Sequence, residues 1–389
     1  MRAETMVPEP RKADRPLTKL PLRILFLLDV LNLVGGTEKQ LRELIGHMDR
    51  SRFDPTVVTL YSMDMPHEAE FGGMGCPVRC LGMRKLMSIN GLRAVLKLVS
   101  EIRRKRIDVV HTFFPDASIL GTIAGRLGGA RVVVGRRDLG YWYTPRYLFI
   151  LRLLQRFAHA YLVNSQAVRT LVSKSEGVDL SRVHVVYNGF FELPSGRSRL
   201  TLGDLGFPAE AKLVGIVANL RPIKRLDRFV EMAAGIRDPQ TCFLIVGYGE
   251  MHDALVEQAR LAGLADRFRI THAIRGVLEI VKLFRVAVLT SESEGLSNTL
   301  IEYGLAGVPA VAFDVGGNRE VIEDEASGFL VKPYDVGALR ERVEELITDE
   351  GLRNRLGALA RIVCTERFGG ARMVEKTQAI YERLNIRDP

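Results

Sequence analysis

Residues 293–302 read Ser293-Glu294-Gly295-Leu296-Ser297-Asn298-Thr299-Leu300-Ile301-Glu302 and follow an apolar run, Val286-Ala287-Val288-Leu289. The run is typical of a buried strand, and the apolar spacing that follows predicts a helix over Asn298–Ala306. Glu294 is therefore expected in the loop after a strand, and Glu302 within the next helix. Ligands of open α/β sheets bind at this edge, where strands end and helices begin. Two acids there suit hydroxyl-rich ligand parts, such as a sugar ring and a ribose; the alternative is a glutamate near a helix N-terminus and an ordinary surface glutamate.

The residues downstream favour the ligand-binding interpretation. They read Gly307-Val308-Pro309-Ala310-Val311 and then Gly316-Gly317 with Glu320, which predicts a strand, a glycine pair and a helix start. Together with Ser291 to Gly295 and Glu302, this order and spacing resembles the nucleotide-sugar half of retaining glycosyltransferases with the GT-B architecture, in glycosyltransferase family 4. The resemblance covers nearly the whole chain from about Leu22 onward.

The resemblance carries expectations about fold, activity and site. It implies an α/β fold of two Rossmann-like domains that face a central cleft, with a C-terminal helix that crosses back to the first domain. It implies that Glu294 binds the donor sugar and Glu302 the ribose, and it assigns Leu296, Ser297 and Asn298 to the same donor-binding segment. The implied reaction transfers a sugar from a nucleotide diphosphate sugar to a hydroxyl acceptor, with retention of anomeric configuration.

Strand-like and helical patterns alternate along both halves of the 389 residues, which is typical of parallel sheets covered by helices. The strand-like runs are Arg23–Asp29, Thr56–Leu60, Ile107–His111, Arg131–Val134, Ala160–Val163, Val183–Val186, Leu213–Asn219, Thr241–Val246, Arg267–Thr271, Val286–Leu289 and Ala310–Phe313. We expect five segments: a disordered tail (1–20), an N-terminal acceptor-side domain (21–190), a linker (191–200), a C-terminal nucleotide-sugar domain (201–370) and a helix that returns to the first domain (371–389).

Glycines and cations at the ends of two strands indicate a phosphate site. Gly35 and Gly36 follow the first strand and open a helix, where backbone N–H groups and the helix dipole favour an anion; the alternative is a simple turn. Arg221 and Lys224 follow the first strand of the second half, where cations suit a phosphate. The Gly35-Gly36 loop resembles the family's G-G-x-E, which contacts the donor diphosphate. Lys224 matches the family's lysine, whereas Asn219 occupies the place of the family's usual arginine, and Arg221 could supply the guanidinium instead.

Two further positions match the family pattern. Gly247 and Gly249 correspond to its G-x-G turn and are assigned to the floor of the donor cleft; a turn without ligand contact is the alternative. In the first half, many relatives carry H-x-H after a strand, and the second histidine contacts the donor sugar. Here His111 matches the first histidine, Phe113 replaces the second, and Asp116 stands where some relatives have another sugar-contacting residue. The expected catalytic set is thus Glu294, Lys224, Arg221 and Asp116.

The charge of the chain is divided unevenly. Residues 1–200 hold 31 Lys and Arg against 18 Asp and Glu, a net charge of +13, whereas residues 201–389 hold 24 against 28, or −4. A basic half indicates an anionic partner or merely solvated helix faces. The loop Arg136–Tyr143 suits an acceptor with sugar and phosphate parts, or is anchored by buried aromatics. The basic run Arg103–Arg106 and the amphipathic stretch Arg146–Phe157 suit an anionic bilayer, although such a helix more often packs on its own sheet.

We therefore expect a cytoplasmic glycosyltransferase, associated peripherally with the inner face of the membrane. Its expected partners are a nucleotide-sugar donor, a saccharide or lipid-linked saccharide acceptor and an anionic membrane surface. No nucleic acid is expected, because no recognition motif accompanies the charge. No metal or other cofactor is expected, since no metal-ligand cluster is evident and cations stand at the phosphate site. The alternatives are a nucleotide-sugar epimerase of the same fold and a non-catalytic nucleotide-sugar-binding protein.

Overall fold

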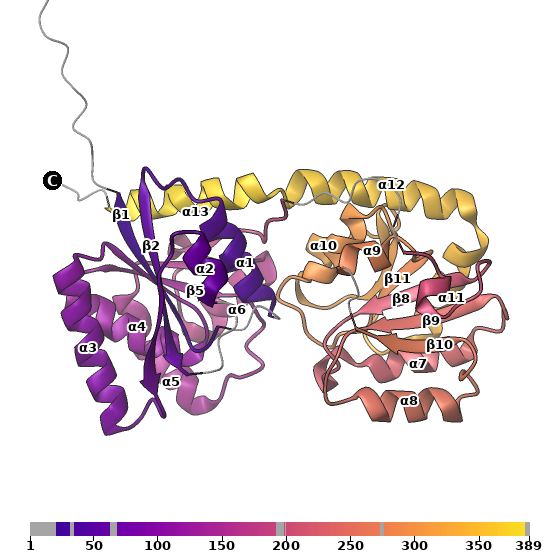
Figure 1. The fold of residues 1–389 in the computed structure, drawn as a ribbon, viewed down its shortest axis with the longest axis horizontal. Helices are drawn as coiled ribbons and strands as arrows, with labels where there is room; N and C mark the ends of the chain where they lie inside the picture. Colours follow the sequence, from indigo (N-terminus) through magenta and orange to yellow (C-terminus); the bar gives the residue numbers. More distant parts are fainter. Residues whose placement is uncertain are drawn as a thin grey trace, which may run out of the picture.

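The computed structural model describes residues 21–31, 35–62, 68–191, 198, 200–272 and 276–385. The expected disordered tail of residues 1–20 and most of the expected linker 191–200 lie outside the described residues. Two α/β domains lie side by side, and the helices α12 (Glu350–Arg367) and α13 (Gly370–Asn385) run along one edge of both (Figure 1).

The first domain is a parallel sheet of seven strands in the order β3-β2-β1-β4-β5-β6-β7. Its strands are β1 (Leu22–Leu28), β2 (Phe53–Tyr61), β3 (Val78–Met83), β4 (Val109–Thr112), β5 (Arg131–Arg136), β6 (Ala160–Val163) and β7 (Val183–Val185). Its helices are α1 (Gly36–Gly46), α2 (Glu68–Gly73), α3 (Ile89–Lys105), α4 (Pro115–Gly128), α5 (Pro145–Leu154) and α6 (Gln166–Glu176). The run Ile24–Leu28 is buried throughout, as a central parallel strand covered on both faces requires.

The second domain is a parallel sheet of six strands in the order β10-β9-β8-β11-β12-β13. Its strands are β8 (Lys212–Val217), β9 (Thr241–Val246), β10 (Phe268–Thr271), β11 (Val286–Leu289), β12 (Ala310–Phe313) and β13 (Gly328–Val331). The helices are α7 (Leu226–Gly235), α8 (His252–Leu261), α9 (Val277–Val281), α10 (Asn298–Leu305) and α11 (Val336–Thr348). One apolar cluster packs on each face of this sheet.

The last two helices join the domains. Helix α12 packs on α10 of the second domain, whereas α13 contributes Met373, Val374, Ile380 and Tyr381 to the core of the first. The Tyr381 hydroxyl lies 2.6 Å from His111 Nδ1 at the end of β4. The expected architecture, including the crossover, is therefore confirmed. His111 has a structural role, because its ring holds α13 to the end of β4.

Candidate functional site

The segment that follows β11 has the geometry that its sequence predicts. Strand β11 leads into a loop that carries Glu294, and α10 then begins at Asn298 with Glu302 in its second turn. The Ser297 hydroxyl caps this helix by accepting a hydrogen bond from the Leu300 N–H at 3.3 Å. Leu296 is buried in the core. The side chains of Leu296 and Ser297 thus have structural roles, and a ligand could contact these residues only through their backbone atoms.

Lys224 and Glu294, expected at the phosphate and the donor sugar respectively, form an ion pair. The Lys224 Nζ donates to Glu294 Oε1 at 2.6 Å, and both side chains are partly exposed. The backbone at Lys224 is fixed because its carbonyl accepts from the Thr290 hydroxyl at 3.0 Å, at the end of β11. The loops after β8 and β11 therefore present a cation and an acid side by side at the carboxyl edge of the sheet. Arg221, three residues earlier, is exposed.

Glu302 is a carboxylic acid in a poorly hydrated place. Burial raises the pKa of its carboxyl to about 7, and the nearby charge of Lys39 in α1 only partly opposes this. Among the described residues no hydrogen bond to this carboxylate is found. Such a group gains stability when hydroxyl donors bind its charged form.

Donor binding is therefore expected to release about half a proton at pH 7, because ribose hydroxyls that donate to ionised Glu302 lower a pKa that starts near 7. At pH 9 the carboxyl is already ionised and no release from it is expected. Titration calorimetry in buffers of different ionisation enthalpy measures this exchange. Glu302→Gln should abolish the release and weaken binding by about 1.5–3 kcal/mol. Proton uptake by the wild-type protein would contradict this assignment.

The N-terminus of α1 faces this segment from the first domain. Gly35 is the N-cap of α1 and has no side chain to cap the helix, and the Glu38 carboxylate of the first turn lies against it. A Cβ atom built on Gly36 would lie 2.8 Å from Asn298 Nδ2, so a larger residue would require the Asn298 side chain to move. The Asn298 Oδ1 also accepts from Asn188 Nδ2 at 2.6 Å. Gly35, Gly36 and Asn298, predicted from separate motifs, are thus brought together where the domains meet.

Gly247 and Gly249 lie under the end of β8. A Cβ atom on Gly247 would overlap the Ala218 carbonyl oxygen, and Gly249 has a φ of +152° beside the Leu220 backbone. The two glycines let the turn after β9 pack against the chain that leads to Arg221. Their assignment to the floor of a donor cleft stays a prediction, as does a contact with a ligand.

Further contacts between the domains are made by Gly295 and Glu320 of the second domain. A Cβ atom on Gly295 would overlap the Arg137 carbonyl oxygen of the first domain. The Glu320 carboxylate of the second domain accepts from the N–H groups of Gln166 at 2.8 Å and Ala167 at 3.0 Å, and so caps α6 of the first domain. It also accepts from the Tyr187 hydroxyl at 2.9 Å. The sequence shows the G-G-x-x-E pattern, but nothing in it reveals this role of Glu320 as a cap across the domains.

Asp116 belongs to a polar cluster at the carboxyl ends of β1, β2 and β4. Its carboxylate accepts from the hydroxyls of Tyr147, at 2.8 Å, and Tyr61. Beside it, Asp29 accepts from the Ala117 N–H at 2.6 Å. Burial raises the pKa of Asp29 to about 7, with a further contribution from Asp116. Sequence reasoning missed Asp29, Tyr61 and Tyr147; the position of Asp29 at the end of an apolar strand was the available signal.

The loop Arg136–Tyr143 is largely anchored inside the first domain. Arg136 is buried and pairs with the buried Glu176, with Nε to Oε1 at 2.7 Å. The Tyr143 hydroxyl donates to Glu176 at 2.5 Å, and the Trp142 indole N–H donates to Asp138 at 3.0 Å. These three side chains anchor the loop within the first domain, whereas Tyr141 is exposed, and a contact of the loop with an acceptor stays a prediction.

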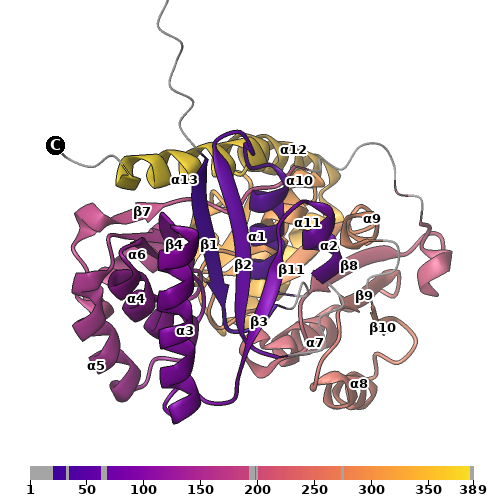
Figure 2. The same cartoon turned by 60° about the vertical axis from the view of Figure 1, so that its left-hand side comes forward.

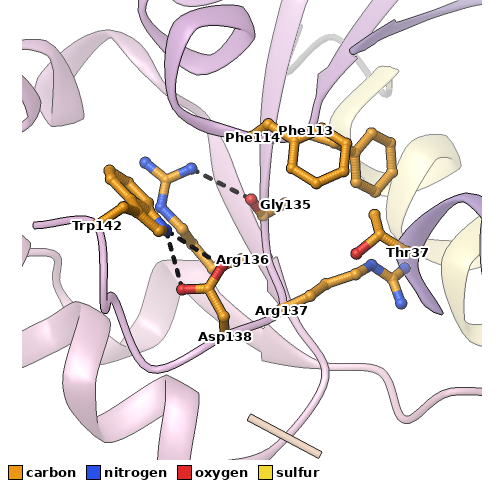
Figure 3. Close-up of a pocket in the computed structure, with 8 residues that line it drawn as sticks. All are labelled: Thr37, Phe113, Phe114, Gly135, Arg136, Arg137, Asp138 and Trp142. Atoms are coloured by element: carbon orange, nitrogen blue, oxygen red, sulfur yellow. Dashed lines mark hydrogen bonds between the residues drawn. The ribbon is translucent and has the colours of Figure 1, made fainter. Parts of the chain in front are cut away.

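A small pocket lies at the ends of β4 and β5 (Figure 3). It is lined by Thr37, Phe113, Phe114, Gly135, Arg136, Arg137, Asp138 and Trp142. Figure 3 shows Arg136 turned toward Trp142, whereas Arg137 extends toward Thr37 of α1. Phe113, which replaces the family's sugar-contacting histidine, is buried and packs on His111. Within the described part of the chain, no group of three or more His, Cys, Asp or Glu is placed to hold a metal ion.

Two Rossmann-like domains joined by a C-terminal crossover helix form the fold of the GT-B glycosyltransferases. Residues 34–190 match the family described as Glycosyltransferase Family 4, and residues 201–363 match that described as Glycosyl transferases group 1. The two matches are adjacent and cover both domains, so the chain belongs to the group 1 glycosyltransferases of GT-B fold.

Similar proteins span most of the chain. A "UDP-Gal:alpha-D-GlcNAc-diphosphoundecaprenol alpha-1,3-galactosyltransferase" of Escherichia coli is 24% identical over 77% of this chain and 81% of its own. A "2-deoxystreptamine N-acetyl-D-glucosaminyltransferase" of Streptomyces fradiae is 27% identical over 86% and 88%. The crystal structure of Anabaena HepE in complex with UDP matches with a TM-score of 0.82 at 23% identity, over 93% of this chain and 100% of that chain.

Proposed function

We propose that the protein transfers a sugar from a nucleotide diphosphate sugar to a hydroxyl group of a saccharide acceptor, with retention of anomeric configuration. The observation that supports this best is the arrangement of Lys224, Glu294 and Glu302 at one sheet edge, opposite the α1 N-terminus of the other domain. Carboxylates suit sugar and ribose hydroxyls, and a cation with a helix N-terminus suits a diphosphate.

In this proposal the leaving diphosphate is stabilised as its negative charge develops. Lys224 and Arg221 supply positive charge from the second domain, and the N–H groups at Gly35 and Gly36 supply dipoles from the first. Fixed charges of this kind lower the barrier because they need no reorganisation during the reaction. Glu294 orients the donor sugar, Glu302 holds the ribose, and no residue is assigned as a covalent nucleophile.

Names of similar proteins support a saccharide acceptor that is linked to a lipid. The E. coli relative acts, by its name, on a sugar joined to diphosphoundecaprenol. HepE has been crystallised with UDP-glucose, which supports a nucleotide diphosphate sugar as donor. We propose a lipid-linked saccharide at the cytoplasmic face of a membrane, within the synthesis of a polysaccharide or glycolipid.

A panel of UDP-, GDP- and ADP-sugars tests the donor assignment. A ligand present at 100 times its Kd should stabilise the fold by about 2.7 kcal/mol, visible as a higher Tm. Product analysis with and without acceptor then separates the alternatives. A changed sugar nucleotide without acceptor would indicate an epimerase, and binding without any product would indicate a non-catalytic binding protein. No stabilisation by any sugar nucleotide would contradict the proposed function.

Activity is expected to persist in EDTA, because Lys224 and Arg221 can neutralise the leaving group without a metal ion. Initial rates should be measured with the cognate donor before and after the chelator, and again after Mg²⁺ or Mn²⁺ is restored. A rate that vanishes in EDTA and returns with the ion would refute the assignment of these two cations.

One face of the first domain, which we name the α3–α5 face, suits an anionic bilayer. It exposes the apolar side chains of Met87, Ile89, Leu92, Leu96, Phe149 and Leu153. Exposed Arg93, Lys97, Arg146 and Arg152 stand among them, and Arg146 of α5 contacts the sulfur of Met87, which lies just before α3. Figure 2 shows α3 and α5 on the same side of the domain. Among the described residues, none of the helices has the length and apolar character needed to cross a membrane.

Binding to anionic vesicles is expected to exceed binding to neutral vesicles and to fall as salt rises, since each basic residue near an anionic surface contributes about 1 kcal/mol. The double variant Leu92→Ser with Leu96→Ser should bind roughly ten-fold more weakly, because apolar burial is lost. Leu261→Ser with Leu359→Ser, which changes two exposed leucines of the second domain and α12, is the matched control. Equal absence from both pellets at low salt would leave a soluble acceptor as the better hypothesis.

A further inference from the structure

Two consecutive arginines at the end of β5, Arg136 and Arg137, have different surroundings. Arg136 is neutralised by Glu176 and also donates to the Ser118 hydroxyl at 2.7 Å. Arg137 has no carboxylate of the described residues within ion-pair distance. Its guanidinium Nη1 donates to Asn188 Oδ1 at 2.7 Å and it lies 5.5 Å from the centre of the Phe113 ring. Within the described part of the chain this partly buried cation contacts a neutral amide and an aromatic ring but pairs with no carboxylate, an arrangement that is costly to maintain.

The position of Arg137 is fixed on several sides. Its carbonyl oxygen accepts from Asn164 Nδ2 at 3.1 Å and lies against Gly295 of the second domain. Its side-chain partner Asn188 bonds in turn to Asn298, at the start of α10. The guanidinium extends into the pocket toward Thr37, in the first turn of α1 (Figure 3). The cation therefore stands next to the first turn of α1, where the N-cap residue, Gly35, has no side chain.

We propose that Arg137 is a phosphate ligand, which with the first turn of α1 forms an oxyanion site on the first-domain side of the reaction centre. The flat guanidinium fork matches the geometry of a phosphate, and the α1 N-terminus adds the N–H groups that a phosphate accepts. The phosphate belongs to the donor diphosphate or to a phosphorylated acceptor. The proposed function gives Arg137 no role toward either phosphate. This inference rests on the proposed function only for the identity of the donor.

The proposed phosphate site has an acid nearby, Glu38. Glu38 lies in the first turn of α1, and a Cβ atom on Gly35 would overlap its carboxylate. Burial lowers the pKa of the Arg137 guanidinium to about 10, while the charges of Tyr381 and Glu38 oppose this shift. Arg137 stays charged at neutral pH, and Glu38 offsets part of that charge from beyond ion-pair distance. The site is thus expected to hold a phosphate moderately rather than very tightly.

Arg137→Gln and Arg137→Lys test the site, with exposed Arg126→Gln on α4 as the matched control. Calorimetry should measure three ligands: the nucleoside diphosphate that stabilises the wild-type protein, its nucleoside, and inorganic phosphate added to the protein with and without saturating nucleoside diphosphate. Melting temperatures of the variants establish that they fold. Loss of one charged hydrogen-bond donor is expected to change the affected Kd by about ten-fold or more.

If the phosphate is that of the donor, Arg137→Gln raises the Kd of the nucleoside diphosphate, leaves that of the nucleoside unchanged, and Arg137→Lys recovers part of the affinity. If it is that of the acceptor, the nucleoside diphosphate binds as before, but inorganic phosphate no longer binds the nucleotide-saturated protein. Unchanged affinities for both, with Arg137→Gln folded, would overturn the inference. If no nucleotide binds the wild-type protein, the donor proposal fails by itself. Inorganic phosphate with and without Arg137 then decides the site, and its failure to bind the wild-type protein also overturns it.

Discussion

Replacement of Lys224 by glutamine is expected to lower turnover of the cognate donor by about 100- to 1,000-fold, the usual effect of removing one group that stabilises developing charge. The lysine is held in the loop after β8, with its Nζ 2.6 Å from Glu294 Oε1, and its backbone is fixed by Thr290. Glutamine keeps most of the side-chain length but has no charge to offer a leaving diphosphate. It also leaves the Glu294 carboxylate without its counterion, so the donor sugar loses an ordered acid as well.

The loss should appear mainly in kcat, because the charge of the leaving group grows on the way to the transition state. Steady-state kinetics with the donor identified from the panel measures it. Lys212→Gln is the matched control, since Lys212 pairs with Asp238 at 3.0 Å at the opposite end of β8. Lys212→Gln should leave kcat unchanged. A Lys224→Gln enzyme with wild-type kcat would remove Lys224 from the catalytic set.

Replacement of Gly295 by alanine is expected to reduce kcat/KM by about 100-fold, because a misplacement of about 1 Å between reacting groups has effects of this size. Gly295 follows Glu294, the proposed sugar-binding acid, and faces the Arg137 carbonyl across the domain boundary. A Cβ atom there would overlap that backbone oxygen and would hold the domains apart. The second sheet is not involved in the clash, so the nucleotide should still bind this domain.

Kinetics combined with nucleotide binding shows whether Gly295→Ala loses activity because the domains are held apart or because the second domain is misfolded. Gly295→Ala should bind the nucleoside diphosphate within a few-fold of wild type yet lose turnover. Gly72→Ala is the control, because nothing lies within 4 Å of a Cβ atom built there. An active Gly295→Ala enzyme would mean that the contact between Gly295 and Arg137 does not occur during the reaction.

Residues close together in sequence were predictable, and those joined only by the fold were not. The apolar run Val286–Leu289 and the spacing after Asn298 define a strand and a helix, so the places of Glu294 and Glu302 followed from local rules. The pairing of Glu294 with Lys224 joins residues 70 positions apart. It required knowledge that the loops after β8 and β11 are neighbours, which the family resemblance implied and periodicity did not.

The missed elements have physical reasons as well. Strand β3 lies at the sheet edge, is mostly half-exposed and carries no apolar run, so it lacks the pattern of a buried strand. Strand β13 has only four residues, Gly328–Val331, and begins with a glycine. The Arg136–Glu176 pair joins a strand end to a helix end 40 positions away. No sequence pattern distinguished buried Arg136 from its neighbour Arg137, although their surroundings differ completely.

The crossover helix has a consequence for how the protein is made. Helix α13 supplies Tyr381 and Ile380 to the core that also contains β1, so the first and last elements of the chain complete one sheet face. During synthesis, at about 5–20 residues per second, the ribosome delivers Tyr381 only after every strand of the second domain has emerged. Until then the apolar face under α13 is uncovered. The nascent first domain is therefore a natural client for chaperones, and premature termination before α13 should yield an aggregation-prone fragment rather than a functional half.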